Sequence, residues 1–131
     1  MQTREQKYAQ DVYTRVCAVK KAQDVGGSKI DPKKYGGIAH KLPILIRTAG
    51  LAQALTFVEA RGKESQHQLL RDLGATVNHE KDLAQYVRHA ELAEYMRLTQ
   101  QVLDALLWYK RFAQSVLGVE AGEGDEEDRD D

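Results

Sequence analysis

Apolar residues at three- and four-residue spacing run through most of the last third of this chain. From Leu83 to Leu117 the spacing continues with little interruption. One face of an α-helix repeats in this way, whereas a half-buried strand would alternate apolar and polar residues. No window of the sequence shows a convincing alternation. The segment is predicted to form one long helix, or two with a bend near Ala90, and the predicted fold class is all-α.

Four further helices are predicted in residues 3–77, separated by turn and capping residues. A capping box of Thr3 and Gln6 begins the first, and Gly26-Gly27-Ser28 ends it. Asp31, as N-cap in front of Pro32, begins the second. The expected apolar faces are Tyr8, Val12, Val16 and Val19, then Ile38, Leu42, Leu45 and Ile46, then Leu51, Ala54, Leu55 and Val58, and finally Leu69, Leu70, Leu73 and Val77.

Proline and glycine set the limits of the second, third and fourth helices. Pro43 lies inside the second helix and predicts a kink or an irregular turn, because its ring removes a backbone donor. Gly50 is the expected end of the second helix, and the third ends near Gly62. The fourth spans residues 66–77 and is followed by a break at Asn78-His79. Residues 1–118 are expected to form a compact bundle of about five to six helices with a long C-terminal helix.

Charge is unevenly distributed, although 19 basic and 20 acidic residues give a net charge of −1. Residues 120–131 carry eight acidic side chains and one arginine, which leaves 18 basic against 12 acidic elsewhere. Residues 1–47 hold ten basic and four acidic side chains, and residues 48–119 hold eight of each. The basic character therefore belongs to the first third of the chain.

Seven basic residues gather around the end of the first helix, the Gly-Gly loop and the second helix. Such a cluster can neutralise the phosphates of a nucleic acid in a salt-dependent and largely sequence-independent manner. Long basic side chains that solvate a helical face explain the pattern equally well. The residues are Lys20, Lys21, Lys29, Lys33, Lys34, Lys41 and Arg47, and Lys110 and Arg111 in the last helix are candidates to extend the surface.

The end of the chain has one dominant charge sign and no apolar spacing. Residues 119–131 are therefore expected to be a disordered acidic tail that follows a helical domain of residues 1–118. The tail has two interpretations. It either keeps the protein soluble or competes with nucleic acid for the basic surface.

Residue types that support catalysis or metal binding are present but not grouped. None of His40, His67, His79 and His89 pairs with another at i, i+4 spacing, and no cysteine or carboxylate cluster completes a zinc-type set. These imidazoles are expected to be solvated or partly buried, and Cys17 to be a small core residue. We predict no catalytic residue, no metal site, no cofactor and no enzyme activity.

Membrane and secretion signals are missing from the sequence. No apolar stretch approaches the roughly 20 residues that span a bilayer, and the N-terminus has no apolar region typical of a signal peptide. A single cysteine suits a reducing compartment. We therefore expect a cytoplasmic protein without a membrane partner.

Two blocks of sequence follow an ordered pattern. KYGGIAHKLPILIRTAGLAQALTFV, residues 34–58, contains Tyr-Gly, a basic residue, Leu-Pro, an aliphatic run, a small-residue-Gly break and Leu-x-Gln-Ala-Leu-x-Phe. ALLWYKRFAQSVL, residues 105–117, contains Trp-x-Lys-Arg-Phe-Ala. The pattern residues are Tyr35, Gly36, Lys41, Leu42, Pro43, Gly50, Leu51, Gln53, Leu55, Phe57, Trp108 and Phe112. Over residues 8–117 the chain resembles the small α-helical subunit of type III-B CRISPR-associated Cmr complexes.

This resemblance implies a non-enzymatic subunit of a ribonucleoprotein that cleaves RNA complementary to a guide. Such subunits stack on copies of themselves in the minor filament and line the channel where guide RNA and target RNA pair. Cleavage is assigned to the backbone subunit and nucleotide chemistry to the large subunit. The implied partners are therefore the other Cmr subunits, copies of this chain, guide RNA and target RNA.

The pattern residues also lead to structural hypotheses. Gly36-Gly37 and Ala49-Gly50 are expected to permit close helix packing and a sharp turn. Pro43 would direct Lys41 and Arg47 to one side of the second helix. Trp108 and Phe112 share one helical face, where a core position is favoured over contact with a neighbouring subunit.

A free helical adaptor or dimerisation module is the alternative. In that case the basic cluster would meet an acidic protein partner. Assembly separates the two, because the complex subunit predicts head-to-tail stacking with RNA and the adaptor predicts a small closed oligomer without it.

Overall fold

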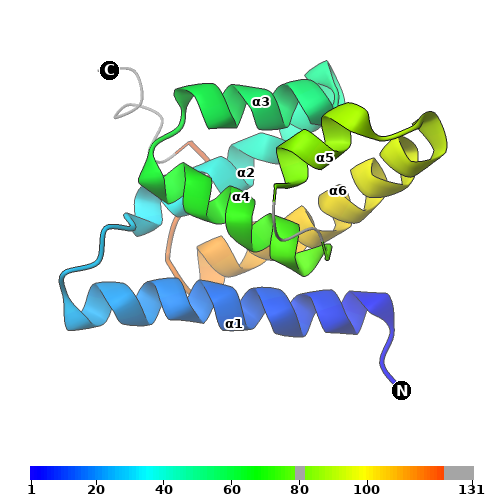
Figure 1. The fold of residues 1–131 in the computed structure, drawn as a ribbon. Helices are drawn as coiled ribbons and strands as arrows, with labels where there is room; N and C mark the ends of the chain where they lie inside the picture. Colours follow the sequence, from blue (N-terminus) through cyan, green and yellow to red (C-terminus); the bar gives the residue numbers. More distant parts are fainter. Residues whose placement is uncertain (79–81, 123–131) are drawn as a thin grey trace.

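The fold is all-helical, as the spacing of the apolar residues predicts (Figure 1). A computed structural model describes residues 1–78 and 82–122, in which six α-helices and no strand occur. None of the described helices is long and apolar enough to cross a membrane. The helices are α1 (Arg4–Val25), α2 (Pro32–Ala49), α3 (Leu51–Arg61), α4 (Glu64–Thr76), α5 (Leu83–His89) and α6 (Leu92–Ser115).

Local capping contacts explain where several helices begin and end. The Gln6 amide donates to the Thr3 hydroxyl at 3.1 Å, and the Thr3 amide donates to the Gln6 side-chain oxygen at 2.9 Å, which confirms the capping box. The Asp31 carboxylate accepts from the Lys33 amide at 3.0 Å at the start of α2. Between α5 and α6, Ala90 has extended backbone (φ −71°, ψ 143°). Of the two predictions for the last segment, the two-helix one is therefore correct.

A tight corner joins α2 to α3 at Gly50. The helix α2 continues through Pro43, and Gly50 then adopts φ +92°, a conformation that favours glycine. Gly50 has no side chain to cap α3, so the Tyr95 hydroxyl of α6 accepts from the Ala52 amide at 3.1 Å. A Cβ at residue 50 would lie 3.3 Å from that hydroxyl oxygen. The corner thus requires both a glycine and a residue of α6.

The longest helix, α6, forms the middle of the packing. It lies against both α1 and α2, while α2 also packs on α3 and α4, and α5 packs on α3 (Figure 1). The predicted apolar faces meet in one core, in which only Leu45 and Leu70 of those sixteen positions are half-buried rather than buried. The last helix contributes Leu98, Val102, Ala105, Leu106, Tyr109 and Ala113.

A buried polar network lies inside this core and was not predicted. The Asp72 carboxylate of α4 accepts from the Tyr35 hydroxyl of α2 at 2.6 Å and from the Gln68 side-chain amide at 2.9 Å. One turn further along α4, the Thr76 hydroxyl lies 2.8 Å from the Tyr109 hydroxyl of α6. Since buried polar groups are costly unless paired, these bonds fix how α2, α4 and α6 pack together.

The first helix joins the network through Arg15. Its guanidinium donates to Asp11 at 2.9 Å and lies 3.9 Å from Asp72. Burial raises the pKa of the Asp72 carboxyl above its ordinary value of 3.8, while the Tyr35 hydrogen bond opposes that rise. Burial also raises the pKa of the Tyr35 and Tyr109 hydroxyls. Both tyrosines therefore remain protonated.

After α6 the chain returns to α2, and Val119 is buried there with 2% exposure. The His40 ring nitrogen Nε2 lies 2.9 Å from the Val119 carbonyl oxygen. A Cβ at Gly36 would lie 2.9 Å from the Val119 Cβ, so the glycine makes room for this residue. The first residue of the expected tail, 119–131, is thus packed on α2. The predicted disorder of residues 123–131 concerns a segment outside the described residues.

Candidate nucleic-acid interface

The first group of predicted cations lies where α1 ends and α2 begins. These two helix ends are on the same side of the molecule (Figure 1). Lys21, Lys29 and Lys33 are exposed, and Lys34 is half-buried. Lys20 lies 3.8 Å from Asp24 one turn away, an exposed pair of the kind that contributes little to stability. The fold therefore keeps most of this group available to solvent.

The second group follows the outer side of α2. Lys33 and Arg47 are exposed and Lys34 and Lys41 are half-buried, whereas Leu42 on the inner side is fully buried. We call Lys33, Lys34, Lys41 and Arg47 the α2 basic face. Lys33 and Arg47 are 14 residues apart, which is about 21 Å along a helix. Within residues 1–78 and 82–122, none of the four forms an ion pair.

The α2 basic face continues onto α3 through Phe57. The ring centroid of Phe57 lies 5.8 Å from Lys41 Nζ and 5.6 Å from the Arg61 guanidinium carbon. Both distances fit cation–π contacts, which hold the two charges beside one aromatic ring. Arg61 was missed by the sequence reasoning, although its i, i+4 spacing from Phe57 was a usable signal. Phe57 itself is 39% exposed and therefore only partly a core residue.

A small cavity of about 60 Å³ adjoins these side chains. It lies between α2, α3 and the start of α4, and Lys41, Arg61 and Gln66 contribute its polar groups. The two cations make this a place where an anion such as a phosphate would be favoured.

The candidates on α6 lie apart from one another. Lys110 is half-buried and Arg111 is exposed. Consecutive helical residues differ by about 100° in direction, so these two side chains point to different sides of α6. Their membership of a single surface with the α2 basic face stays a prediction.

Trp108 and Phe112 lie between core and surface. Both are half-buried and pack against the core, with ring centroids 5.6 Å apart and an interplanar angle of 27°. Tyr13 of α1 meets Phe112 edge-on at 5.2 Å. These aromatic contacts join α1 to α6, while Tyr109 between them is fully buried.

Most pattern residues serve the packing of α2 and α3. Gln53 is exposed, and Phe57 is partly exposed as described above. Lys41 is half-buried. The remaining members on these two helices are buried or form the corner: Tyr35, Gly36, Leu42, Pro43, Leu51 and Leu55 are buried, and Gly50 forms the turn.

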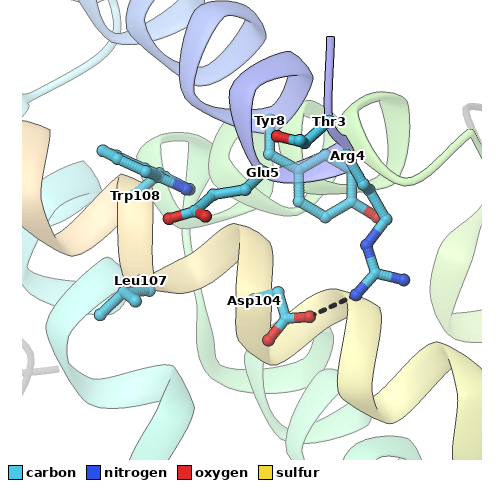
Figure 2. Close-up of a pocket in the computed structure, with 7 residues that line it drawn as sticks. All are labelled: Thr3, Arg4, Glu5, Tyr8, Asp104, Leu107 and Trp108. Carbon is cyan, nitrogen blue, oxygen red and sulfur yellow. Dashed lines mark hydrogen bonds and ion pairs between the residues drawn. The ribbon is translucent and has the colours of Figure 1, made fainter.

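A surface groove of about 460 Å³ lies between the start of α1 and α6 (Figure 2). Arg4 forms an ion pair with Asp104 across it at 2.7 Å. Burial raises the pKa of the Tyr8 hydroxyl, and the Arg4 charge partly offsets that rise. The side chains of Glu5 and Trp108 point into the same opening (Figure 2). The groove joins residues about a hundred positions apart, so no sequence pattern indicated it.

The remaining histidines and the cysteine are dispersed. His40 is buried with 5% exposure, more than predicted, and its Nδ1 has no hydrogen-bond partner in the described structure. His67 is half-buried and His89 is exposed, whereas His79 lies outside the described residues. Cys17 is half-buried, so its predicted core position is only partly correct. In the described part of the chain no three His, Cys, Asp or Glu side chains are placed to hold a metal ion.

The fold and its surface define a class: a small helical bundle whose second helix carries cations without ion-pair partners among the residues that the structure describes. The chain belongs to the CRISPR-associated Cas_Cmr5 protein family, which its residues 4–116 match. It is 43% identical over 119 residues to the CRISPR system Cmr subunit Cmr5 of Thermus thermophilus, a match that covers 89% of this chain and 98% of that protein. The resemblance found in the two sequence blocks is thereby confirmed.

A solved structure is similar as well. The crystal structure of a CRISPR-associated Cmr5 family protein from Thermus thermophilus matches with a TM-score of 0.77 and 43% sequence identity. The match covers 89% of this chain and 99% of the other. The acidic segment that begins at Glu120 lies beyond the residues that match the family.

Proposed function

We propose that this chain is a non-catalytic small subunit of a type III-B CRISPR Cmr complex. In this role it joins the other Cmr subunits, stacks with copies of itself in the minor filament and contacts guide and target RNA through its basic surface. The supporting observation is its 43% identity to a protein named as a Cmr subunit, over 98% of that protein's length.

The α2 basic face supports the RNA part of the proposal. Its cations have no acidic partners among the described residues, so phosphates are suitable counter-charges. In an RNA-guided complex, base pairing supplies the sequence specificity and protein contacts stabilise the backbone. A surface of lysines and arginines without a base-reading motif fits that division of roles.

The Phe57 ring restricts the motion of the two cations beside it, Lys41 and Arg61. A lysine on a free stem loses side-chain entropy when it binds a phosphate. Because Lys41 and Arg61 both rest beside the Phe57 ring, part of that entropy is already lost before RNA arrives. We therefore assign Lys41 and Arg61 the strongest phosphate contacts of the surface.

Purification of a tagged copy from its own host, in cells that express the other subunits, tests the proposal. The particle is sized under native conditions and its RNA is sequenced. A multi-subunit particle with short guide RNAs is the expected result. A lone monomer or dimer without RNA would contradict it and would favour the helical adaptor with an acidic protein partner.

A further inference from the structure

The C-terminal segment leaves the body of the protein at a defined place on α2. The Val119 amide donates to the Ala113 carbonyl at 2.9 Å, which folds the chain back from the end of α6. A carbonyl oxygen can only accept, so His40 Nε2 carries the hydrogen that bonds Val119. With the side chain of Val119 seated against Gly36, residue 119 is held on the first half of α2 from two sides.

Strong negative charge follows this attachment directly. The Glu120 carboxylate accepts from the Gln114 side-chain amide at 3.1 Å. Residues 123–131 then carry seven acidic side chains and one arginine, a net charge of −6. All of this charge lies beyond the residues that match the family, so it is a feature that the family match does not explain.

The α2 basic face is within reach of these residues. Nine residues span at most about 30 Å when extended, and the 18 residues of α2 extend about 27 Å along the helix axis. Since residue 119 is attached beside Gly36 and His40, both ends of the face are accessible to the segment. The charges are complementary, and the four cations lack ion-pair partners among the described residues.

We propose that residues 123–131 dock on the α2 basic face of their own molecule and compete there with RNA. The competition rests on the function proposed above, whereas the docking does not. A tethered segment acts at a high effective concentration, about millimolar for short flexible links, so that weak contacts suffice. RNA must displace the segment, and therefore short or weakly held RNA is rejected first.

The docking is tested by zero-length carbodiimide cross-linking of the full-length monomer at low salt, with mass spectrometric assignment of the products. Isopeptide bonds from residues 123–131 to Lys33, Lys34 and Lys41 are expected. Lys7, in the first turn of α1, serves as the internal control. Cross-links mainly to Lys7 would overturn docking on the α2 basic face. In a mixture of isotope-labelled and unlabelled protein, cross-links that form only between different molecules would indicate a second copy as the occupant.

The competition is tested by comparing the full chain with a variant in which the seven acidic residues of 123–131 are replaced by Asn or Gln. If the segment covers the face for about four-fifths of the time, the neutral variant binds RNA about fivefold more tightly. The probe is an oligouridylate of about 15 nucleotides. The difference should close as salt screens both interactions. A variant with the same acidic residues in shuffled order should bind like the natural chain.

The two experiments separate the possible failures. Equal affinity of the natural and neutral chains would overturn the competition, even where the cross-links support docking. If neither chain binds RNA, both the competition and the proposed RNA contact are overturned, and the cross-links still decide the docking.

Discussion

The buried polar network and the α2 basic face hold their charges in opposite ways. In the network, the Asp72 carboxylate has Tyr35 and Gln68 as close partners and a guanidinium 3.9 Å away. On the α2 basic face, Lys41 and its neighbouring cations have no acidic partner among the described residues. The hydrogen bonds of the network hold three helices together. The cations of the α2 basic face remain able to bind the negative charge of another molecule.

This difference has energetic consequences for mutation. Removal of one member of a buried network leaves its partners without hydrogen bonds in a low-dielectric interior. Removal of an exposed cation leaves only solvent where the charge was, and stability usually changes by less than about 0.5 kcal/mol. Substitutions in the two regions should therefore separate stability from RNA binding.

The largest effect is expected for Asp72→Ala. The substitution leaves Tyr35 and Gln68 without their acceptor and should lower the free energy of unfolding by about 2–4 kcal/mol. Urea denaturation measures the loss. In Asp72→Asn the side-chain oxygen still accepts from Tyr35, so this control should lose less. Equal losses in the two variants would show that the carboxylate partners do not matter.

The next effect concerns the attachment of Val119. A Cβ at Gly36 would lie 2.9 Å from the Val119 Cβ, so Gly36→Ala should cost about 1–3 kcal/mol through overpacking. Val119→Ala keeps the Cβ but removes Cγ1 and Cγ2, which would lie 3.0 and 3.2 Å from the new methyl group, so the double variant should recover part of the loss. A double-mutant cycle from urea denaturation measures that coupling, and purely additive losses would contradict the contact.

A smaller effect, on binding alone, is expected for Lys41→Gln and Arg61→Gln. Each should weaken RNA binding by about fivefold, or about 1 kcal/mol, and leave stability unchanged. The slope of log affinity against log salt should become shallower by about 0.7 for each phosphate that the variant no longer neutralises. Arg97→Gln is the matched control, because Arg97 already pairs with Glu94 on α6. Weakening by the control to the same extent would contradict a localised site.

The smallest effect is a pH dependence of stability that comes from Asp72. Its pKa is higher in the folded chain than the ordinary 3.8, so the folded state binds the proton more tightly. The stability that Asp72 protonation contributes is fully present below its ordinary pKa of 3.8. It is lost as pH rises through the higher pKa of the folded state. Comparison of the unfolding free energies of the natural chain and Asp72→Asn over this pH range isolates it. A difference that does not change with pH would contradict the raised pKa.

Local features of the fold were predictable because neighbouring residues determine them. The capping box at Thr3, the N-cap at Asp31 and the end of α2 at Gly50 all depend on residues within one helical turn. The two family blocks were also recognisable, since their order is a linear pattern. Most of the core follows from apolar spacing in the same way.

The remainder depends on contacts between distant residues. Thr76 and Tyr109 are separated by 33 positions; Thr76 belongs to no motif, and Tyr109 fills the variable position of the second block. Likewise, Val119 carries no sequence signal that would separate it from the acidic segment behind it. Arg61 is different, because its i, i+4 spacing from Phe57 is a local signal, although Arg61 lies outside the basic first third of the chain. Which cations contact RNA stays a prediction.

The corner at Gly50 also has a consequence for the order of folding. The first turn of α3 obtains a hydrogen-bond acceptor from Tyr95, which lies 43 residues further along the chain. During synthesis, residues 50–61 leave the ribosome well before Tyr95 does. The corner therefore stays incomplete until α6 arrives, and the two halves of the protein must complete their folding together.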